Sequence, residues 1–289
     1  MKKLLLFLLL ITFSFVNAQI NTQVSNYNVC DTNSDGIAQF DLNTKIPEIL
    51  GNENPSIHNI TFHVSNVDAQ FGNNPIQNPI AFTNTTSTQM IWARVINTQT
   101  SQLWVSQFNL IVNIQPNAGS DGSITVCETF TAVINLFQLI SGEQSGGTWT
   151  RTSGTGGTFN ALSGTYAPAF GSTPSTFSYT LPGIPPCIDD TSVAEVNLSA
   201  QLTAGLDGVI TVCNTSTTPI DLYSLITGEQ LGGTWIRTAG VGGTFSSVTG
   251  TFIPSPNSTT STFNYTINGT APCFNDSSVA TVIINSCGP

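Results

Sequence analysis

The chain has 289 residues, of which 6 are Lys or Arg and 16 are Asp or Glu, for a formal net charge of −10 at pH 7. So few basic side chains exclude a nucleic-acid surface, which needs clustered Lys and Arg to displace counterions, and an anionic membrane repels the chain for the same reason. Thr, Ser, Asn and Gly are abundant while charged residues make up 8%, a composition that favours strands and turns over helices.

The first 18 residues have the pattern of a secretory signal peptide. Lys2 and Lys3 precede the apolar run 4–15, which is shorter than the ~20 residues that a membrane-spanning helix needs. Small residues then lead to an expected cleavage site before Gln19. No other segment is apolar enough to cross a membrane. We therefore predict an exported chain, secreted or at the cell surface, without membrane insertion.

Residues 19–116 are predicted to form a first domain, which is a diverged relative of the repeats that follow it. Asp41 is expected to cap a short helical turn that Gly51 closes. Apolar residues alternate in 90–95 and in 108–114, a pattern that predicts half-buried strands.

Residues 117–202 and 203–289 are two copies of one unit at an offset of 86 positions. The offset relates Cys127 to Cys213, Trp149 to Trp235 and Cys187 to Cys273, without insertion or deletion. A repeat of this size with its own cysteines indicates an array of small domains.

Each copy shows about seven short runs of strand-forming residues separated by Gly, Pro, Asn and Ser, as in β-sandwiches. The order Cys, Trp, Cys within a copy resembles immunoglobulin domains, in which a core Trp packs on a disulfide. We therefore predict an all-β fold of tandem immunoglobulin-like β-sandwich domains in an elongated array. The pattern does not give the strand order.

The six cysteines of an exported chain are predicted to form disulfides. Because the unit is duplicated, we expect the pairing to stay inside each copy, which closes a loop worth about 4 kcal/mol of chain entropy. The expected pairs are Cys127 with Cys187 and Cys213 with Cys273. Cys30 and Cys287 are left over. Cys287 is expected to bond material outside the chain or to stay free.

Asp31, Asn33 and Asp35 match the start of a calcium loop, with oxygen ligands at positions 1, 3 and 5 and the turning Gly36 at position 6. Position 12 of such a loop is a carboxylate, but here it is Leu42. The alternative is a turn held by Asx hydrogen bonds, and the sequence favours it. Calcium is the one cofactor that the sequence offers.

Acidic and amide side chains in turns form a second group of candidate ligands. Two acidic turns can share an ion between domains, but solvated or hydrogen-bonded loop carboxylates are the commoner arrangement and the one we expect. The residues concerned are Asp121, Glu143, Asp189, Asp190, Asp207, Glu229, Asn275 and Asp276.

Trp149 with Arg151, and Trp235 with Arg237, share one face of a strand if side chains alternate. An exposed pair can stack on a sugar ring, whereas a Trp between two cysteines is more often in the core with the arginine stem covering its edge. We expect the core position.

The two histidines, His58 and His63, are placed on opposite faces of a predicted strand and are not expected to share a metal ion. Neither lies near a serine or cysteine motif typical of nucleophilic catalysis. The sequence contains no recognisable catalytic constellation, so we predict that the chain is not an enzyme.

Several strings resemble the tandem repeats of very large exported proteins of gliding Bacteroidetes: DGSITVC, LITGEQLGGTW and RTSGTGGTF. The opening CDTNSDGIAQFDL, with ITFHVSNVDAQFGNNPI and IWARVINTQT, is similar to another module common in those proteins. Such proteins usually end in a sorting domain for type IX secretion or gliding-associated export. No such domain is recognised here, and we expect a fragment or a truncated product.

The resemblance implies an adhesin-like protein whose ligand is an unknown glycan or protein. We therefore expect a non-enzymatic stalk or adhesion module. The alternative is a calcium-dependent carbohydrate- or protein-binding module centred on the first domain, because that domain diverges beside two near-copies.

Overall fold

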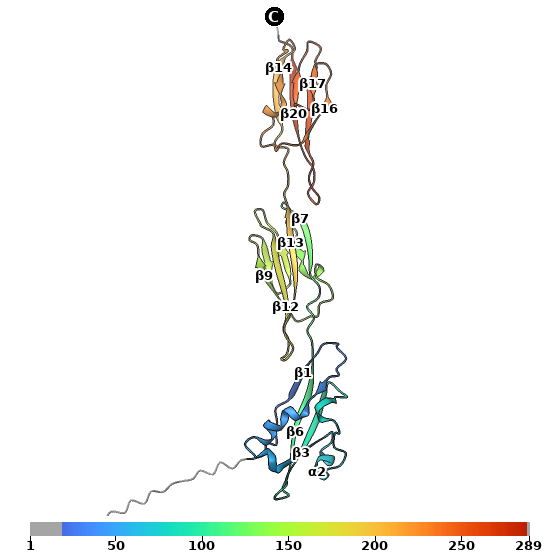
Figure 1. Cartoon of the computed structure of the whole chain (residues 1–289). Helices are drawn as coiled ribbons and strands as arrows, with labels where there is room; N and C mark the ends of the chain where they lie inside the picture. The colour runs from blue at the N-terminus through green and yellow to red at the C-terminus, as the bar shows by residue number, and fades with distance from the viewer. Residues whose placement is uncertain (1–18, 288–289) are drawn as a thin grey trace, which may run out of the picture. The chain divides into compact units, whose positions relative to one another are not determined.

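The computed structural model describes residues 19–287 (Figure 1). The predicted signal peptide, residues 1–18, lies outside the described residues. The backbone divides into two compact units, one with residues up to 116 together with the loop 182–190, and the other with 117–181 and the chain from 191 onward. None of the helices in residues 19–287 has the length and apolar character required to cross a membrane.

The first unit is built on a four-stranded sheet with the strand order β1-β6-β5-β3. β1 (Tyr27–Asp31) runs parallel to β6 (Leu103–Ile114), and β5 (Thr88–Asn97) runs antiparallel to both β6 and β3 (His58–His63). The strands predicted at 90–95 and 108–114 are thus confirmed. A second pair, β2 (Gln39–Phe40) with β4 (Phe82–Thr83), is antiparallel.

Short helices fill the connections of the first unit. They are η1 (Leu42–Lys45), α1 (Ile46–Leu50), η2 (Pro55–Ile57), α2 (Asn66–Phe71) and η3 (Pro79–Ala81). Asp41 caps η1 by accepting a hydrogen bond from the Asn43 amide, and Gly51 ends α1 with φ of 56°. Both predicted helix-end roles are confirmed.

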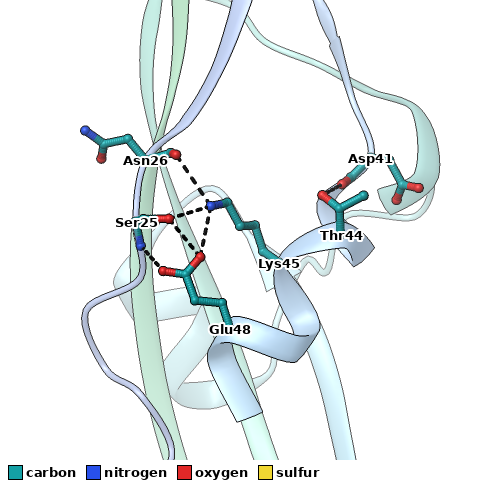
Figure 2. Close-up of polar contacts among 6 residues, drawn as sticks. All are labelled: Ser25, Asn26, Asp41, Thr44, Lys45 and Glu48. Carbon is teal, nitrogen blue, oxygen red and sulfur yellow. Dashed lines mark hydrogen bonds and ion pairs between the residues drawn. The ribbon is translucent and has the colours of Figure 1, made fainter. Parts of the chain in front are cut away.

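A polar cluster fastens the segment before β1 to α1 (Figure 2). The Glu48 carboxylate accepts hydrogen bonds from the Ser25 amide and, at 2.8 Å, from the Ser25 hydroxyl. Lys45 Nζ donates to Ser25 Oγ at 2.9 Å and pairs with Glu48 Oε2 at 3.0 Å. Burial opposes ionisation of Glu48, but these hydrogen bonds and Lys45 outweigh it and hold the pKa of its carboxyl below the ordinary value.

Each copy of the repeat folds into two sheets. The strands of the first copy are β7 (Gly122–Cys127), β8 (Ile134–Asn135), β9 (Thr148–Ser153), β10 (Thr158–Asn160), β11 (Thr165–Ala167), β12 (Ser175–Leu181) and β13 (Asp190–Ser199). Those of the second copy are β14 (Gly208–Cys213), β15 (Ile220–Asp221), β16 (Thr234–Ala239), β17 (Thr244–Ser246), β18 (Thr251–Ile253), β19 (Ser261–Ile267) and β20 (Asp276–Asn285). One 3-10 turn follows β8, η4 (Leu136–Gln138), and one follows β15, η5 (Leu222–Ser224).

The strand order is that of the immunoglobulin fold. The larger sheet has the order β7-β13-β12-β9 in the first copy and β14-β20-β19-β16 in the second. The smaller sheet joins β8, β11 and β10, or β15, β18 and β17. In chain order these are strands C, F and G in one sheet and B, E and D in the other, with the first strand added parallel to G. The predicted class, all-β with tandem immunoglobulin-like domains, is confirmed.

The first domain keeps most of this plan. β1, β6, β5 and β3 take the places of the first strand and of G, F and C, and the pair β2 with β4 takes the places of B and E. Helix α2 lies between β3 and β4 in the chain, where each copy has strand D.

Aromatic side chains form the core of each copy. Trp149 is 3% exposed, and its ring centroid lies 5.4 Å from that of Phe137 and 5.3 Å from that of Tyr179. Trp235 is 1% exposed and packs in the same way on two tyrosines. The core position predicted for both tryptophans is confirmed.

The arginine of each pair covers a neighbouring part of the core. The Arg151 guanidinium lies over the rings of Tyr166 and Phe177, 5.1 and 5.7 Å from their centroids, and donates to Ser175 Oγ at 2.6 Å. Arg237 makes the same contacts in the second copy. Each arginine therefore seals the core edge, over rings other than the tryptophan.

Candidate functional site: the cysteine junctions

The three disulfides join different cysteines from those predicted. They are Cys30–Cys187, Cys127–Cys273 and Cys213–Cys287. The expected pairs Cys127–Cys187 and Cys213–Cys273 are wrong, as is the expectation that Cys287 stays free or bonds outside the chain. No free cysteine occurs in the described part of the chain.

The length of a strand explains why pairing inside a copy fails. Cys127 ends β7, beside Ser199 at the end of the parallel strand β13. Cys187 lies in the loop before β13 begins at Asp190. At ~3.3 Å per residue β13 separates its two ends by roughly 30 Å, whereas bonded cysteines need Cα atoms within about 7 Å of each other.

We call Cys30, Cys127 and Cys213, which lie in β1, β7 and β14, the strand cysteines. Cys187 and Cys273, which lie in the loops 182–190 and 268–275, are the loop cysteines. In two of the three disulfides a strand cysteine bonds the loop cysteine of the next domain along the chain. We call this arrangement a junction.

A glutamine borders the first junction. Gln115 lies two residues past Asn113, the β6 residue that pairs with Cys30. Its Oε1 is 2.8 Å from Cys30 Sγ, and its Nε2 donates to the Ile188 carbonyl at 3.4 Å. Because a bonded sulfur has no hydrogen, the first of these is a contact and not a hydrogen bond. Asn113 Nδ2 donates to the Pro185 carbonyl at 3.2 Å.

The second junction repeats the first. Gln201 lies two residues past Ser199, the β13 residue that pairs with Cys127. Its Oε1 is 3.3 Å from Cys127 Sγ, and its Nε2 donates to the Phe274 carbonyl at 3.0 Å. The glutamine therefore holds the incoming loop by its backbone, whatever the side chain after the loop cysteine.

The two loops are closed by the same hydrogen bonds. The Gly183 amide donates to Asp189 Oδ1 at 2.9 Å, and the Gly269 amide donates to Asn275 Oδ1 at 3.0 Å. Each loop cysteine amide donates to the carbonyl three residues earlier, at 2.9 Å. These loop side chains thus have a structural use, the hydrogen-bonded arrangement that the sequence favoured.

The third strand cysteine has a different partner. Cys213 ends β14 beside Asn285, and Cys287 occupies the position two residues on that Gln115 and Gln201 hold in the other domains. Cys287 is exposed, while the loop cysteines Cys187 and Cys273 are 5% and 6% exposed.

The Asp31 turn uses its carboxylates as hydrogen-bond acceptors. Asp31 is 2% exposed, and it accepts from the amides of Asn33 and Ser34 on Oδ1 and from Gly36 on Oδ2, at 3.2, 2.7 and 2.7 Å. The Gly36 amide, with the other two, holds the pKa of the Asp31 carboxyl below its ordinary value. Asp35 accepts from Asn33 Nδ2 and from the Ile37 amide. This is the Asx-turn arrangement.

The histidines have separate partners. His63 is fully buried, with Nδ1 donating to the Asn73 carbonyl at 2.7 Å and Nε2 2.9 Å from Thr61 Oγ1. His58 Nδ1 donates to the Asn54 carbonyl at 2.8 Å. Within residues 19–287, no group of three or more His, Cys, Asp or Glu is arranged to hold a metal ion.

The strand order and the junctions define a class: tandem immunoglobulin-like domains joined by disulfides, an architecture typical of extracellular proteins. Residues 26–116 match the family described as the Flavobacterium inter-domain disulphide bond domain. The match supports the resemblance to immunoglobulin-like repeat modules of Bacteroidetes. Cys30 lies in the matched segment and bonds Cys187 outside it.

Solved structures with weak overall likeness are also multidomain chains. A titin I-band fragment is 8% identical, with 93% of this chain and 98% of that chain covered and a TM-score of 0.46. A mouse clustered protocadherin fragment is 9% identical, with 91% and 100% covered and a TM-score of 0.32. Extracellular domains 3 to 5 of Drosophila OTK are 9% identical, with 93% and 98% covered and a TM-score of 0.31. The fold assignment rests on the strand order. Comparison with curated proteins gave no match.

Proposed function

We propose that the chain is a non-enzymatic extracellular structural protein, a stalk whose disulfides limit how far it can be stretched. Export through the predicted signal peptide would deliver it to an oxidising compartment, where such bonds persist. The observation that carries the proposal is the order in which the disulfides connect the chain.

The disulfides provide a short covalent route through the molecule. From residue 19 it follows the backbone to Cys30, crosses to Cys187, follows the backbone to Cys213 and crosses to Cys287. The route contains 11 residues before the first bond and 26 between the two. Fully extended at ~3.5 Å per residue, it measures about 130 Å, against about 940 Å for the chain from 19 to 287 without disulfides.

A pull on the two ends therefore loads only a small part of the chain. Residues 31–186 and 214–286 lie outside the shortest route, so unfolding of a sandwich would add no length beyond the limit that the disulfides set. Such a chain keeps its length under tension even when a domain opens, which is the property that a stalk requires.

The test is single-molecule force extension of residues 19–289 held at both ends. The oxidised protein should show no extension beyond about 130 Å. Replacing both Cys30 and Cys187 by Ser leaves a shortest route of 108 residues to Cys127 and 14 after Cys273, and should raise the limit to about 430 Å. Unfolding steps beyond the limit in the oxidised wild-type chain would refute the proposal.

The Cys127–Cys273 bond supplies a matched control because it lies off the shortest route. Replacing both of these residues by Ser removes one disulfide, as in the test variant, yet should leave the limit unchanged. A longer limit in this control would show that the route is assigned wrongly.

The adhesion role predicted from the sequence is a separate proposal, with a glycan or protein ligand still to be found. Glycan-array and whole-cell binding by the full exported chain tests it, with specific binding as the supporting result.

A further inference from the structure

The end of β14 has the features of a junction without the incoming loop. Cys213 pairs with Asn285 in the parallel register that Cys30 makes with Asn113 and Cys127 makes with Ser199. Asn285 is the same residue type as Asn113, whose amide holds the Pro185 carbonyl of the loop in the first junction.

A buried polar atom beside Cys213 has no partner. In the second junction Glu128 Oε1, next to Cys127, accepts a hydrogen bond from the Gln201 amide at 3.0 Å. Asn214 holds the same position next to Cys213, and its Oδ1 is buried without a hydrogen bond. A buried acceptor of this kind costs free energy until a donor reaches it.

We propose that the end of β14 is an acceptor site for a cysteine-bearing loop of a further immunoglobulin-like domain, and that the Cys213–Cys287 bond occupies the site until exchange. The partner is recognised by its chemistry: a loop of the form Gly-x-x-Pro-Cys, as at 183–187 and 269–273. Both such loops of this chain are already bonded, so the partner loop belongs to a domain whose cysteine is reduced.

The exchange balances without an oxidant. The thiolate of the partner loop attacks Cys213 Sγ, a new S–S bond forms, and the Cys213–Cys287 bond breaks. Cys287 leaves as a thiolate and takes up the proton that the partner thiol released. The exposure of Cys287 allows it to leave, and Asn285 is then free to donate to the carbonyl of the incoming loop as Asn113 does.

This inference deepens the proposed structural function, because it names the partner that lengthens the stalk. Its test measures bond chemistry and not extension, so either can fail alone. The oxidised full chain is incubated with a reduced peptide of sequence NGTAPCFND, residues 268–276, and with a scrambled peptide that keeps Pro-Cys apart. Bonded sites are read by mass spectrometry after alkylation.

We expect the peptide on Cys213, with Cys287 alkylated as the released thiol, about tenfold faster than for the scrambled peptide, the effect of one or two hydrogen bonds. The Cys30–Cys187 and Cys127–Cys273 bonds should stay intact as internal controls. Equal rates for the two peptides, or attachment to Cys287 in place of Cys213, would overturn the proposal.

A second variant removes the dependence on exchange. Cys287→Gln restores the glutamine of the other junctions and leaves Cys213 as a thiol. The peptide, activated as a mixed disulfide, should react with Cys213 about tenfold faster than the activated scrambled peptide, and Asn285→Ala in the same background should remove most of that preference. Loss of sequence preference in Cys287→Gln alone would contradict the site.

Discussion

Cys127 and Cys187 lie at opposite ends of β13, one beside its last residue and the other in the loop before its first. A sandwich built in this way presents one cysteine at each end, and neither can reach the other. Each cysteine must therefore find its partner outside its own sandwich, which gives the chain a direction: strand cysteine to the loop of the following domain.

The accessibility of the bonds predicts the order in which they are reduced. Cys287 is exposed, whereas each of the other two bonds contains a loop cysteine no more than 6% exposed. Under limiting dithiothreitol, alkylation should mark Cys213 and Cys287 before the other four cysteines, because an exposed bond is open to thiolate attack. Simultaneous labelling of all six would contradict this order.

Tyr179 predicts a local cost in the first copy. Its hydroxyl accepts from the Gly147 amide at 2.9 Å and donates to the Gln144 carbonyl at 2.8 Å. Tyr179→Phe leaves both groups unpaired and should lower the free energy of unfolding by about 2 kcal/mol. Tyr166→Phe is the control, since that hydroxyl makes only long contacts of 3.4 and 3.5 Å, and it should cost less than about 1 kcal/mol.

Asp31 predicts a pH dependence of stability. Its pKa is lowered in the folded protein from the model value of 3.8, so the stability that its ionised form contributes is fully present above about pH 4 and is lost as the pH falls through the folded pKa. Urea unfolding from pH 6 down to pH 2 should show this loss in the first domain. Asp31→Asn should be less stable at pH 6 and should lose less below pH 4.

Calcium provides a test of the alternative function. Both Asp31 oxygens already accept backbone hydrogen bonds. We therefore expect calcium at about 1 mM, the affinity range of weak extracellular sites, to leave the thermal unfolding midpoint of the chain unchanged. A midpoint that rises with calcium in the wild type and not in Asp31→Asn would revive the calcium-dependent module.

Local patterns predicted much of the fold. The duplication, the alternation in 90–95 and 108–114, and the Asp41 cap depend on neighbouring residues, which the sequence displays directly. The core position of Trp149 followed from the expectation of a sandwich. The strand order required knowledge of long-range pairing, and the pattern did not contain it.

The disulfide pairing was missed because duplication was taken to require bonds inside a copy. A pattern in which each strand cysteine bonds the next loop is equally regular, and only the length of β13 distinguishes the two. One signal was present in the sequence: Gln201 in the first copy aligns with Cys287 in the second. A cysteine that replaces a junction glutamine marks the domain where the bonding differs.

The most direct test of the account is a disulfide map of the exported chain, digested without reduction. Trypsin cuts only after Lys45, Arg94, Arg151 and Arg237 in the predicted mature chain, and further cleavage at Asp and Glu separates the remaining cysteines. The account predicts peptides that join Cys30 to Cys187 and Cys127 to Cys273. Peptides that join Cys127 to Cys187 and Cys213 to Cys273 would contradict it.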